Sequence, residues 1–176
     1  ESDTDCGALQ YCAPERFCLD LVGAESPCSE LIGSQDKDAL RLGFIMTLSG
    51  PDRDKGVDRA KAVQLAVDEI NAKGGIQRSG HDPQPLAFIA CDDAADEETT
   101  LTAVSYLQDR GVPAVIGPGR SGLLKVAATE RAIPGGTFLL SPSSTAGEIR
   151  DLCSDKLVWR VSSSDTQQAN TLAYFT

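Results

Sequence analysis

Apolar positions between residues 39 and 161 alternate between short continuous runs and runs with helical spacing. Leu40–Leu48 is almost continuously apolar, which is typical of a strand buried on both faces of a sheet. In residues 57–75, apolar side chains recur every three or four positions up to a pair of glycines, which predicts an amphipathic helix. Strands are then predicted at residues 86–91, 114–116, 138–140 and 157–161, and helices at residues 97–109, 122–132 and from 164 or 165 onward.

The regular alternation of strands and helices predicts an α/β fold, a three-layer sandwich in which helices cover both faces of a parallel sheet. In such sheets the loops that follow the strands gather at one edge, and ligands bind there. These loops are polar in this chain, and two of them are rich in hydroxyl groups: residues 49–51, 92–93, 119–121 and 141–145. The sequence therefore predicts a polar ligand site at the carboxyl edge of the sheet.

One predicted strand runs directly into a glycine turn that opens a helix, at residues 112–122, VPAVIGPGRSG. The first N–H groups of a helix have no intrahelical partner and carry a partial positive charge, so this junction predicts a site for a carboxylate or a phosphate. Ser121 can donate to one carboxylate oxygen, and the Thr145 hydroxyl can contact the carboxylate or a neighbouring ammonium group. For Arg120 we expect a salt bridge to Asp92 or Asp93.

Catalytic and cofactor interpretations of the same turn are weaker. The string GPGRSG satisfies the glycine pattern of dinucleotide sites, but it does not follow the first strand, and no acidic residue stands about twenty positions later. A nucleophile elbow would need glycine in place of Leu123, and the single histidine, His81, precedes the serine. Adjacent aspartates such as Asp92 and Asp93 are typical of a turn and a helix cap. We therefore expect no enzymatic activity, no catalytic residue, no metal site and no cofactor.

The first 38 residues differ in composition from the rest of the chain. They carry nine acidic and two basic residues, and they contain four of the six cysteines, Cys6, Cys12, Cys18 and Cys28. Apolar residues are too sparse there for a separate core, so disulfides are expected to supply order, and they indicate an exported protein. The cysteine spacing lacks the paired knuckles of common zinc sites. Four cysteines allow three pairings, and Cys91 and Cys153 are either a further disulfide or free buried thiols.

The net charge of the chain is −10, and no basic stripe interrupts it. A negative surface repels the phosphates of nucleic acids, so we expect no nucleic-acid partner. No apolar run reaches the length of a membrane-spanning helix, and no positively charged segment followed by an apolar one opens the chain as a signal peptide would. An exported protein requires a secretion signal, which we expect to be removed before this sequence begins.

Four sequence blocks occur in the order typical of one known family. They are TLSGPDRDKG with AVDEINAKGGI, then CDDAAD, then AVIGPGRSG, and then LLSPSSTAGEI leading to WRVSSSDTQQA. On these blocks, the chain from about residue 40 to residue 169 resembles the type I periplasmic ligand-binding proteins, in particular the branched-chain amino acid receptors of ABC importers.

The resemblance implies a two-lobed receptor that closes on its ligand like a clamp and delivers it to a membrane permease or a signalling partner, without catalysis. The implied ligand is an amino acid or a similar small carboxylate. In amino-acid-binding members, the serine at the position of Ser121 holds the ligand carboxylate, and the threonine at the position of Thr145 contacts carboxylate and ammonium. Backbone groups at the positions of Ser143 and Ser144 complete the site. The implied location is extracytoplasmic, either in the periplasm or as a membrane-anchored lipoprotein.

The sequence departs from the family pattern in three places. Lys55 stands where amino-acid binders often carry an apolar or aromatic residue, so an acidic or larger polar ligand is conceivable; we count Lys55 as a ligand-binding residue. Residues 1–38 form an extension outside the usual domain. Residues 39–161 correspond to the first lobe, and residues 162–176 to the hinge and the start of a second lobe, where the sequence stops.

Two further expectations follow from that organisation. A chain with one lobe is expected to bind its ligand weakly and to dimerise or swap domains through Leu172, Tyr174 and Phe175 near its end. The alternative to a transport role is a sensory or regulatory ligand-binding module that acts on a partner without transport.

Overall fold

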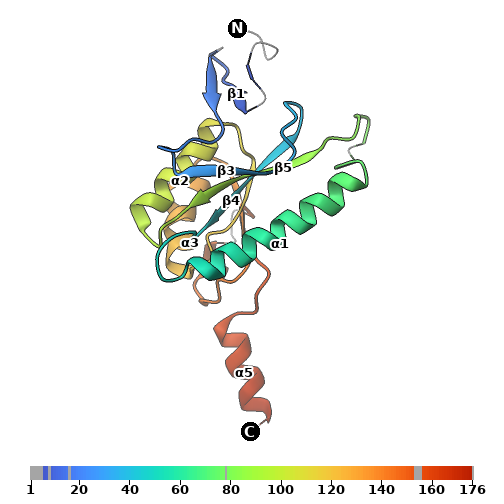
Figure 1. Cartoon of the computed structure of the whole chain (residues 1–176). Helices are drawn as coiled ribbons and strands as arrows, with labels where there is room; N and C mark the ends of the chain where they lie inside the picture. Colours follow the sequence, from blue (N-terminus) through green and yellow to red (C-terminus); the bar gives the residue numbers. More distant parts are fainter. Residues whose placement is uncertain (1–5, 8, 16, 78, 153–155, 176) are drawn as a thin grey trace.

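The computed structural model describes residues 6–7, 9–15, 17–77, 79–152 and 156–175. In this part of the chain, a small two-stranded sheet precedes a six-stranded sheet (Figure 1). The strands are β1 (Gln10–Cys12), β2 (Cys18–Asp20), β3 (Cys28–Gly33), β4 (Leu40–Met46), β5 (Leu86–Asp92), β6 (Ala114–Ile116), β7 (Phe138–Ser141) and β8 (Val158–Arg160). The helices are α1 (Arg53–Ala72), α2 (Glu97–Asp109), α3 (Ser121–Ala127), α4 (Ile149–Leu152) and α5 (Asp165–Phe175), and a π-helical turn, Ala128–Ala132, continues α3.

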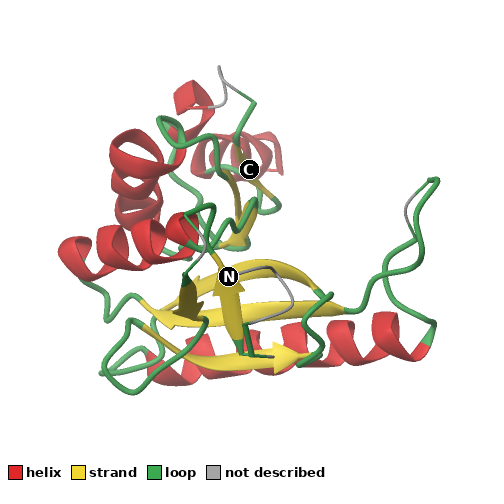
Figure 2. Ribbon diagram, turned by 90° about the horizontal axis from the view of Figure 1, so that it is seen from above, coloured by secondary structure: helices red, strands yellow, loops and turns green. Residues whose placement is uncertain are grey.

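The large sheet has the strand order β3-β5-β4-β6-β7-β8. Five of its strands are parallel to their neighbours, and β3 pairs antiparallel with β5 at one edge. The long helix α1 lies along one face of the sheet, and the other helices of the lobe lie along the opposite face (Figure 2). The α/β three-layer sandwich predicted from the sequence is therefore confirmed, with one antiparallel strand added to the parallel sheet.

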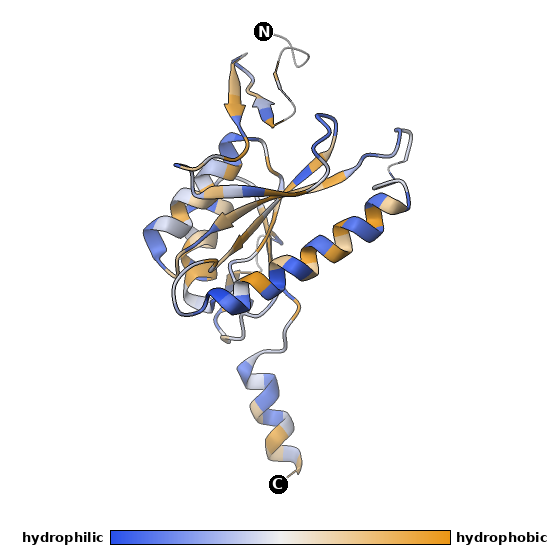
Figure 3. Ribbon diagram, in the orientation of Figure 1, coloured by the Kyte–Doolittle hydropathy of each residue, from blue (hydrophilic) through white to orange (hydrophobic). Residues whose placement is uncertain are grey.

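Neighbouring side chains of the central strand β4 enter two separate cores, because successive residues of a strand point to opposite faces. Phe44 and Met46 belong to the cluster under α1, where Val67 is also fully buried. Ile45 belongs to the cluster under α2 and α3, together with Leu107. The central strands β4 and β5 are accordingly mostly apolar, whereas α1 alternates between polar and apolar positions (Figure 3).

The start of α1 packs very closely against the carboxyl end of β4. A Cβ atom at Gly56 would lie 1.9 Å from the carbonyl oxygen of Thr47, which is less than any real contact. Glycine at this position therefore allows the first turn of α1 to approach the end of the strand. This approach brings the polar residues of that helical turn to the ligand edge of the sheet.

The N-terminal residues are tied to the lobe by covalent and apolar contacts. Strand β3 lies within residues 1–38, yet it forms the edge of the main sheet, and Leu21 is fully buried in the core under α2. One disulfide joins Cys6 to Cys18 on β2 of the small sheet, and another joins Cys28 on β3 to Cys91 on β5. The expectation of disulfides in this region is thus confirmed.

The prediction for Cys91 is wrong, and the prediction for Cys153 concerns a residue outside the described part of the chain. Cys91 is bonded to Cys28, so the suggested pairing of Cys91 with Cys153 is wrong, as is the alternative that Cys91 is a free thiol. The cause is the register of the sheet, which places residues 28 and 91 directly opposite each other. Cys12 is a free thiol, and Cys153 lies outside the described residues.

Most predicted elements match the structure closely. Helix α2 and strand β6 have the predicted bounds, whereas α1 begins at Arg53 instead of residue 57. The small sheet, β3 and α4 were not predicted. In the part of the chain that the structure describes, no helix combines the length and apolar character needed to cross a membrane.

Candidate functional site

A cavity of about 710 Å³ opens at the carboxyl edge of the sheet. The loops that follow four parallel strands contribute to it, as the topology requires. The first turns of α1 and α3 complete its walls. The lining residues are Met46, Thr47, Asp52, Lys55, Arg59, Ala95, Glu97, Gly119, Arg120, Ser121, Gly122, Leu123 and Ser143.

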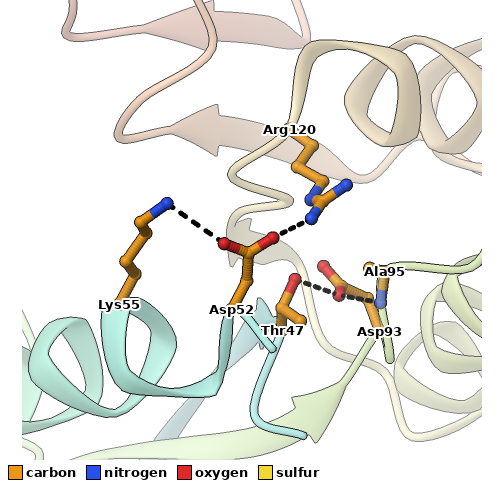
Figure 4. A network of polar contacts seen from close by, with 6 residues as sticks. All are labelled: Thr47, Asp52, Lys55, Asp93, Ala95 and Arg120. Carbon is orange, nitrogen blue, oxygen red and sulfur yellow. Dashed lines mark hydrogen bonds and ion pairs between the residues drawn. The ribbon is translucent and has the colours of Figure 1, made fainter. Parts of the chain in front are cut away.

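Asp52 joins two walls of this cavity. Its carboxylate accepts a hydrogen bond from Lys55 Nζ at 3.0 Å, one turn further along α1, and it forms an ion pair with Arg120 from the loop after β6 (Figure 4). The hydrogen bond and the positive charge of Lys55, followed by the charge of Arg120, hold the pKa of Asp52 below its ordinary value of 3.8. The expected salt bridge from Arg120 to Asp92 or Asp93 is therefore wrong, because the close approach of α1 brings Asp52 nearer.

The two aspartates after β5 instead hold backbone and hydroxyl groups. Asp92 Oδ1 accepts the N–H groups of Leu48 and Ala94, each at 2.8 Å. Asp93 is completely buried, and its Oδ1 accepts from Thr47 Oγ1 at 2.7 Å and from the Ala95 N–H at 2.9 Å (Figure 4). Asp93 thereby fixes Thr47 and Ala95, which both line the cavity. The expectation that these aspartates form a turn agrees with this geometry.

Ser121 connects the loops after β6 and β7. Its Oγ atom accepts the N–H groups of Thr145 at 3.2 Å and Ala146 at 3.3 Å, so its own hydroxyl proton is left to donate. Ser121 is also the first residue of α3, which has no side-chain cap. Among the described residues, no hydrogen bond is made by the N–H groups of Ser121, Gly122 and Leu123, and all three residues line the cavity. This end of the helix can accept an anion.

The serines after β7 have two different positions. Ser143 lines the cavity and donates from Oγ to the Gly119 carbonyl at 2.9 Å. Ser144 is buried behind the wall, where its Oγ lies 3.2 Å from the same carbonyl and 2.7 Å from Ser141 Oγ. Thr145 is half-buried and is held by Ser121, but it is not among the residues that line the cavity. The structure thus brings Ser121, Ser143 and Lys55 into one cavity and sets Ser144 and Thr145 beside it.

Sequence reasoning missed several lining residues, and Arg59 is the most important of them. Its signal was present, because it stands four positions after Lys55 and so shares a face of α1 with it. Thr47 and Glu97 were also missed. In the described part of the chain, no group of three or more histidine, cysteine, aspartate or glutamate residues is arranged to hold a metal ion.

Comparisons with known proteins agree with this architecture. A family model described as periplasmic binding protein matches residues 39–176. A Leu/Ile/Val-binding protein of Rhizobium johnstonii is 29% identical over 138 residues, which cover 77% of this chain and 35% of that protein. A Leu/Ile/Val/Thr-binding protein of Salmonella typhimurium is 27% identical over 138 residues, covering 78% and 36%. The chain thus spans about a third of the length of these relatives.

Solved structures give the same result. The substrate-binding protein of a branched-chain amino acid transporter from Streptococcus pneumoniae, in complex with isoleucine, aligns with a TM-score of 0.63 and 29% identity over 73% of this chain and 35% of its own. An ABC transporter substrate-binding protein from Desulfitobacterium hafniense, in complex with Leu, aligns with a TM-score of 0.64 and 28% identity, covering 78% and 38%. These relatives are binding proteins and not enzymes. Because the family model matches well over half of the sequence, the chain belongs to the periplasmic binding protein family.

Proposed function

We propose that this chain is the ligand-binding lobe of an extracytoplasmic solute-binding protein that captures an amino acid or a similar small carboxylate for an ABC importer. The observation that carries the proposal is the cavity at the carboxyl edge of the sheet, where the uncapped start of α3 meets the hydroxyl groups of Ser121 and Ser143. Family membership and the names of the relatives support the same role.

The chemistry of this wall suits a carboxylate. The N–H groups of residues 121–123 and the free hydroxyl proton of Ser121 supply several donors within one turn of helix. Each charge-assisted hydrogen bond contributes on the order of 1.5 to 3 kcal/mol. Two or three such bonds orient a small anion without any covalent step. We assign direct contact to Ser121, Ser143 and Lys55, and we assign to Ser144 and Thr145 the positioning of the two loops.

Capture by clamp closure is the second part of the proposal. The residues of this lobe line the cavity, and the chain spans about a third of the length of its relatives. We therefore assign the second wall of the clamp, which would face this cavity, to a longer form of the protein. Closure would bury the ligand between the two surfaces and raise its affinity. The two disulfides support an oxidising, extracytoplasmic location, and a membrane permease is the proposed partner.

Binding measurements on the full-length protein test the site. A thermal-shift screen with the twenty amino acids and small carboxylates, followed by calorimetry, identifies binding compounds. Ser121→Ala removes a donor and frees two N–H groups, so we expect it to weaken binding about tenfold or more. Thr145→Ala is expected to weaken binding less, because Thr145 does not line the cavity.

Ser105→Ala is the matched control, because this half-buried serine on α2 also accepts a hydrogen bond at its Oγ atom, from Arg131 Nε, and lies outside the cavity. Its affinity should equal that of the unaltered protein. The proposal is contradicted if no amino acid or small carboxylate binds, or if Ser121→Ala binds as tightly as the control.

A further inference from the structure

Arg59 places a positive charge in the wall of the cavity beside the glycine loop. It stands on α1 one turn after Lys55, and it is half-buried. Its Nη1 atom lies 3.4 Å from the point that a Cβ atom at residue 119 would occupy. Ser143 Oγ lies 3.1 Å from the same point. The guanidinium group therefore reaches across the cavity wall from α1 to the loop that leads into Ser121.

The other two cations of the cavity share one anionic partner. Lys55 and Arg120 both pair with Asp52, whose single carboxylate lies between them (Figure 4). Among the described residues, no hydrogen bond or ion pair engages the side chain of Arg59. Glu97 also lines the cavity but forms no ion pair with Arg59. With three cations and two carboxylates in the lining, Arg59 is the cation that lacks a partner.

Arg59 is a half-buried residue whose guanidinium group has no anionic partner among the described residues. Removing a charge from water without pairing it lowers stability, and arginine presents a planar fork of donors that fits a carboxylate with two parallel hydrogen bonds. Lys55 and Arg120, by contrast, each have a carboxylate partner in the cavity wall. Arg59 instead lines the cavity, with its Nη1 atom beside the glycine loop.

We propose that Arg59 determines specificity by binding a second anionic group of the ligand, so that the site selects dicarboxylic compounds such as acidic amino acids. This inference rests on the proposed function, because the first carboxylate is assigned to Ser121 and the start of α3. It differs from the relatives, whose names describe the binding of uncharged side chains. It also assigns the selection to Arg59 rather than to Lys55, whose charge is shared with Asp52.

The experiment compares acids with their amides, which differ in charge but hardly in size. Calorimetry of the full-length protein would measure the binding of L-glutamate, L-glutamine, L-aspartate, L-asparagine and L-leucine. We expect at least one acid to bind about tenfold or more tightly than its amide. Arg59→Gln should weaken binding of that acid about tenfold or more, leave the amide within about twofold, and so abolish the preference. Arg59→Lys keeps the charge without the fork and should retain part of the preference.

Arg53→Gln is the matched control, because Arg53 lies on the same helix, is exposed, and does not line this cavity. Circular dichroism and thermal unfolding establish that each variant is folded. If leucine or the amides bind at least as tightly as the acids, or if Arg59→Gln keeps the preference, the inference fails while the proposed function stands. If none of the twenty amino acids and small carboxylates binds the unaltered protein, the proposed function fails as well.

Discussion

Asp52 sets the charge balance of the cavity at the scale of a single residue. Its carboxylate pairs with Lys55 from its own helix and with Arg120, which lies in a loop 68 residues away. Without this carboxylate, Lys55 and Arg120 would repel each other and Arg59 across the cavity wall. The removal of Asp52 should therefore change both the stability of the lobe and the affinity of the site for anions.

The pH dependence of stability tests the role of Asp52. Its pKa is lowered from 3.8 in the folded protein, first by the hydrogen bond from Lys55. A group with a lowered folded pKa stabilises the fold above its unfolded pKa, and this contribution disappears as the pH falls through the folded pKa. Asp52→Asn should therefore be less stable than the unaltered protein at pH 7, and the difference should shrink below pH 3.8. Urea unfolding between pH 7 and pH 2.5 measures it.

Asp54→Asn provides the comparison, because Asp54 is an exposed residue of the same helical turn whose nearest cation, Arg53, is 3.7 Å away. This variant should lose much less stability at pH 7. An equal loss in both variants, or a loss in Asp52→Asn that does not change with pH, would show that Asp52 does not act through its charge.

Part of the site could be predicted from single residues and part could not. Ser121 and Ser143 were predictable because loops after parallel strands meet at one edge whatever the details of packing. The partner of Arg120 was not, because it depends on how closely α1 approaches β4, which Gly56 allows and no local pattern reveals. Arg59 belongs to a polar face of α1. A polar face can meet either water or a cavity, and the rotation of the helix decides which of the two it meets.

Among the unpredicted elements, strand β3 changes the predicted fold most, because it adds an antiparallel edge strand to the parallel sheet. Its residues, CSELIG, mix polar and apolar positions and lie within the acidic first 38 residues, so their pattern does not indicate a strand of the main sheet. The bounds of α2, by contrast, were predicted correctly because Asp96 caps its first turn through the Thr99 N–H at 2.8 Å and Gly111 follows its end. Local signals determine elements that start and end with caps, whereas an edge strand depends on its partner.

The bond between Cys28 and Cys91 should stabilise the fold more than any other crosslink described. It closes a loop with a sequence separation of 63, against 12 for the bond between Cys6 and Cys18. Loop-closure entropy gives about 4 kcal/mol for the longer loop, and measured values for native disulfides are about 2 to 5 kcal/mol. We expect Cys28→Ala with Cys91→Ala to lower the free energy of unfolding within this range. Guanidinium unfolding at neutral pH measures the loss.

Cys6→Ala with Cys18→Ala is the matched comparison, because it removes a disulfide from the small sheet and leaves the main sheet intact. Its effect on the unfolding of the lobe should be clearly smaller. Equal losses in the two double variants would contradict a special role for the bond between β3 and β5.

At the scale of the whole molecule, α5 stands apart from the rest of the structure. It projects away from the sheet and has no buried residue (Figure 1). Three of its large apolar side chains are exposed, namely Leu172 (69%), Tyr174 (85%) and Phe175 (81%). Such a surface favours association with another apolar surface. The two cores of the lobe include no residue of α5.

We predict that the 176-residue chain, studied alone, self-associates through α5. Sedimentation velocity should show a mass that rises with concentration. Replacing Leu172, Tyr174 and Phe175 with serine should give a monomer, whereas replacing the exposed Leu65 of α1 with serine should leave association unchanged. A monomeric mass at all concentrations for the unaltered chain would contradict the prediction.

The covalent bond across β3 and β5 also gives the lobe a mechanical property. A pulling force applied to residues before Cys28 reaches the end of β3 that is bonded to Cys91, so the load passes directly into the neighbouring strand β5. Without that bond, the same load would separate the hydrogen bonds of β3 from β5 one after another, which requires little force at each step. The disulfide therefore lets the lobe bear tension through its N-terminal segment without the separation of β3 from β5.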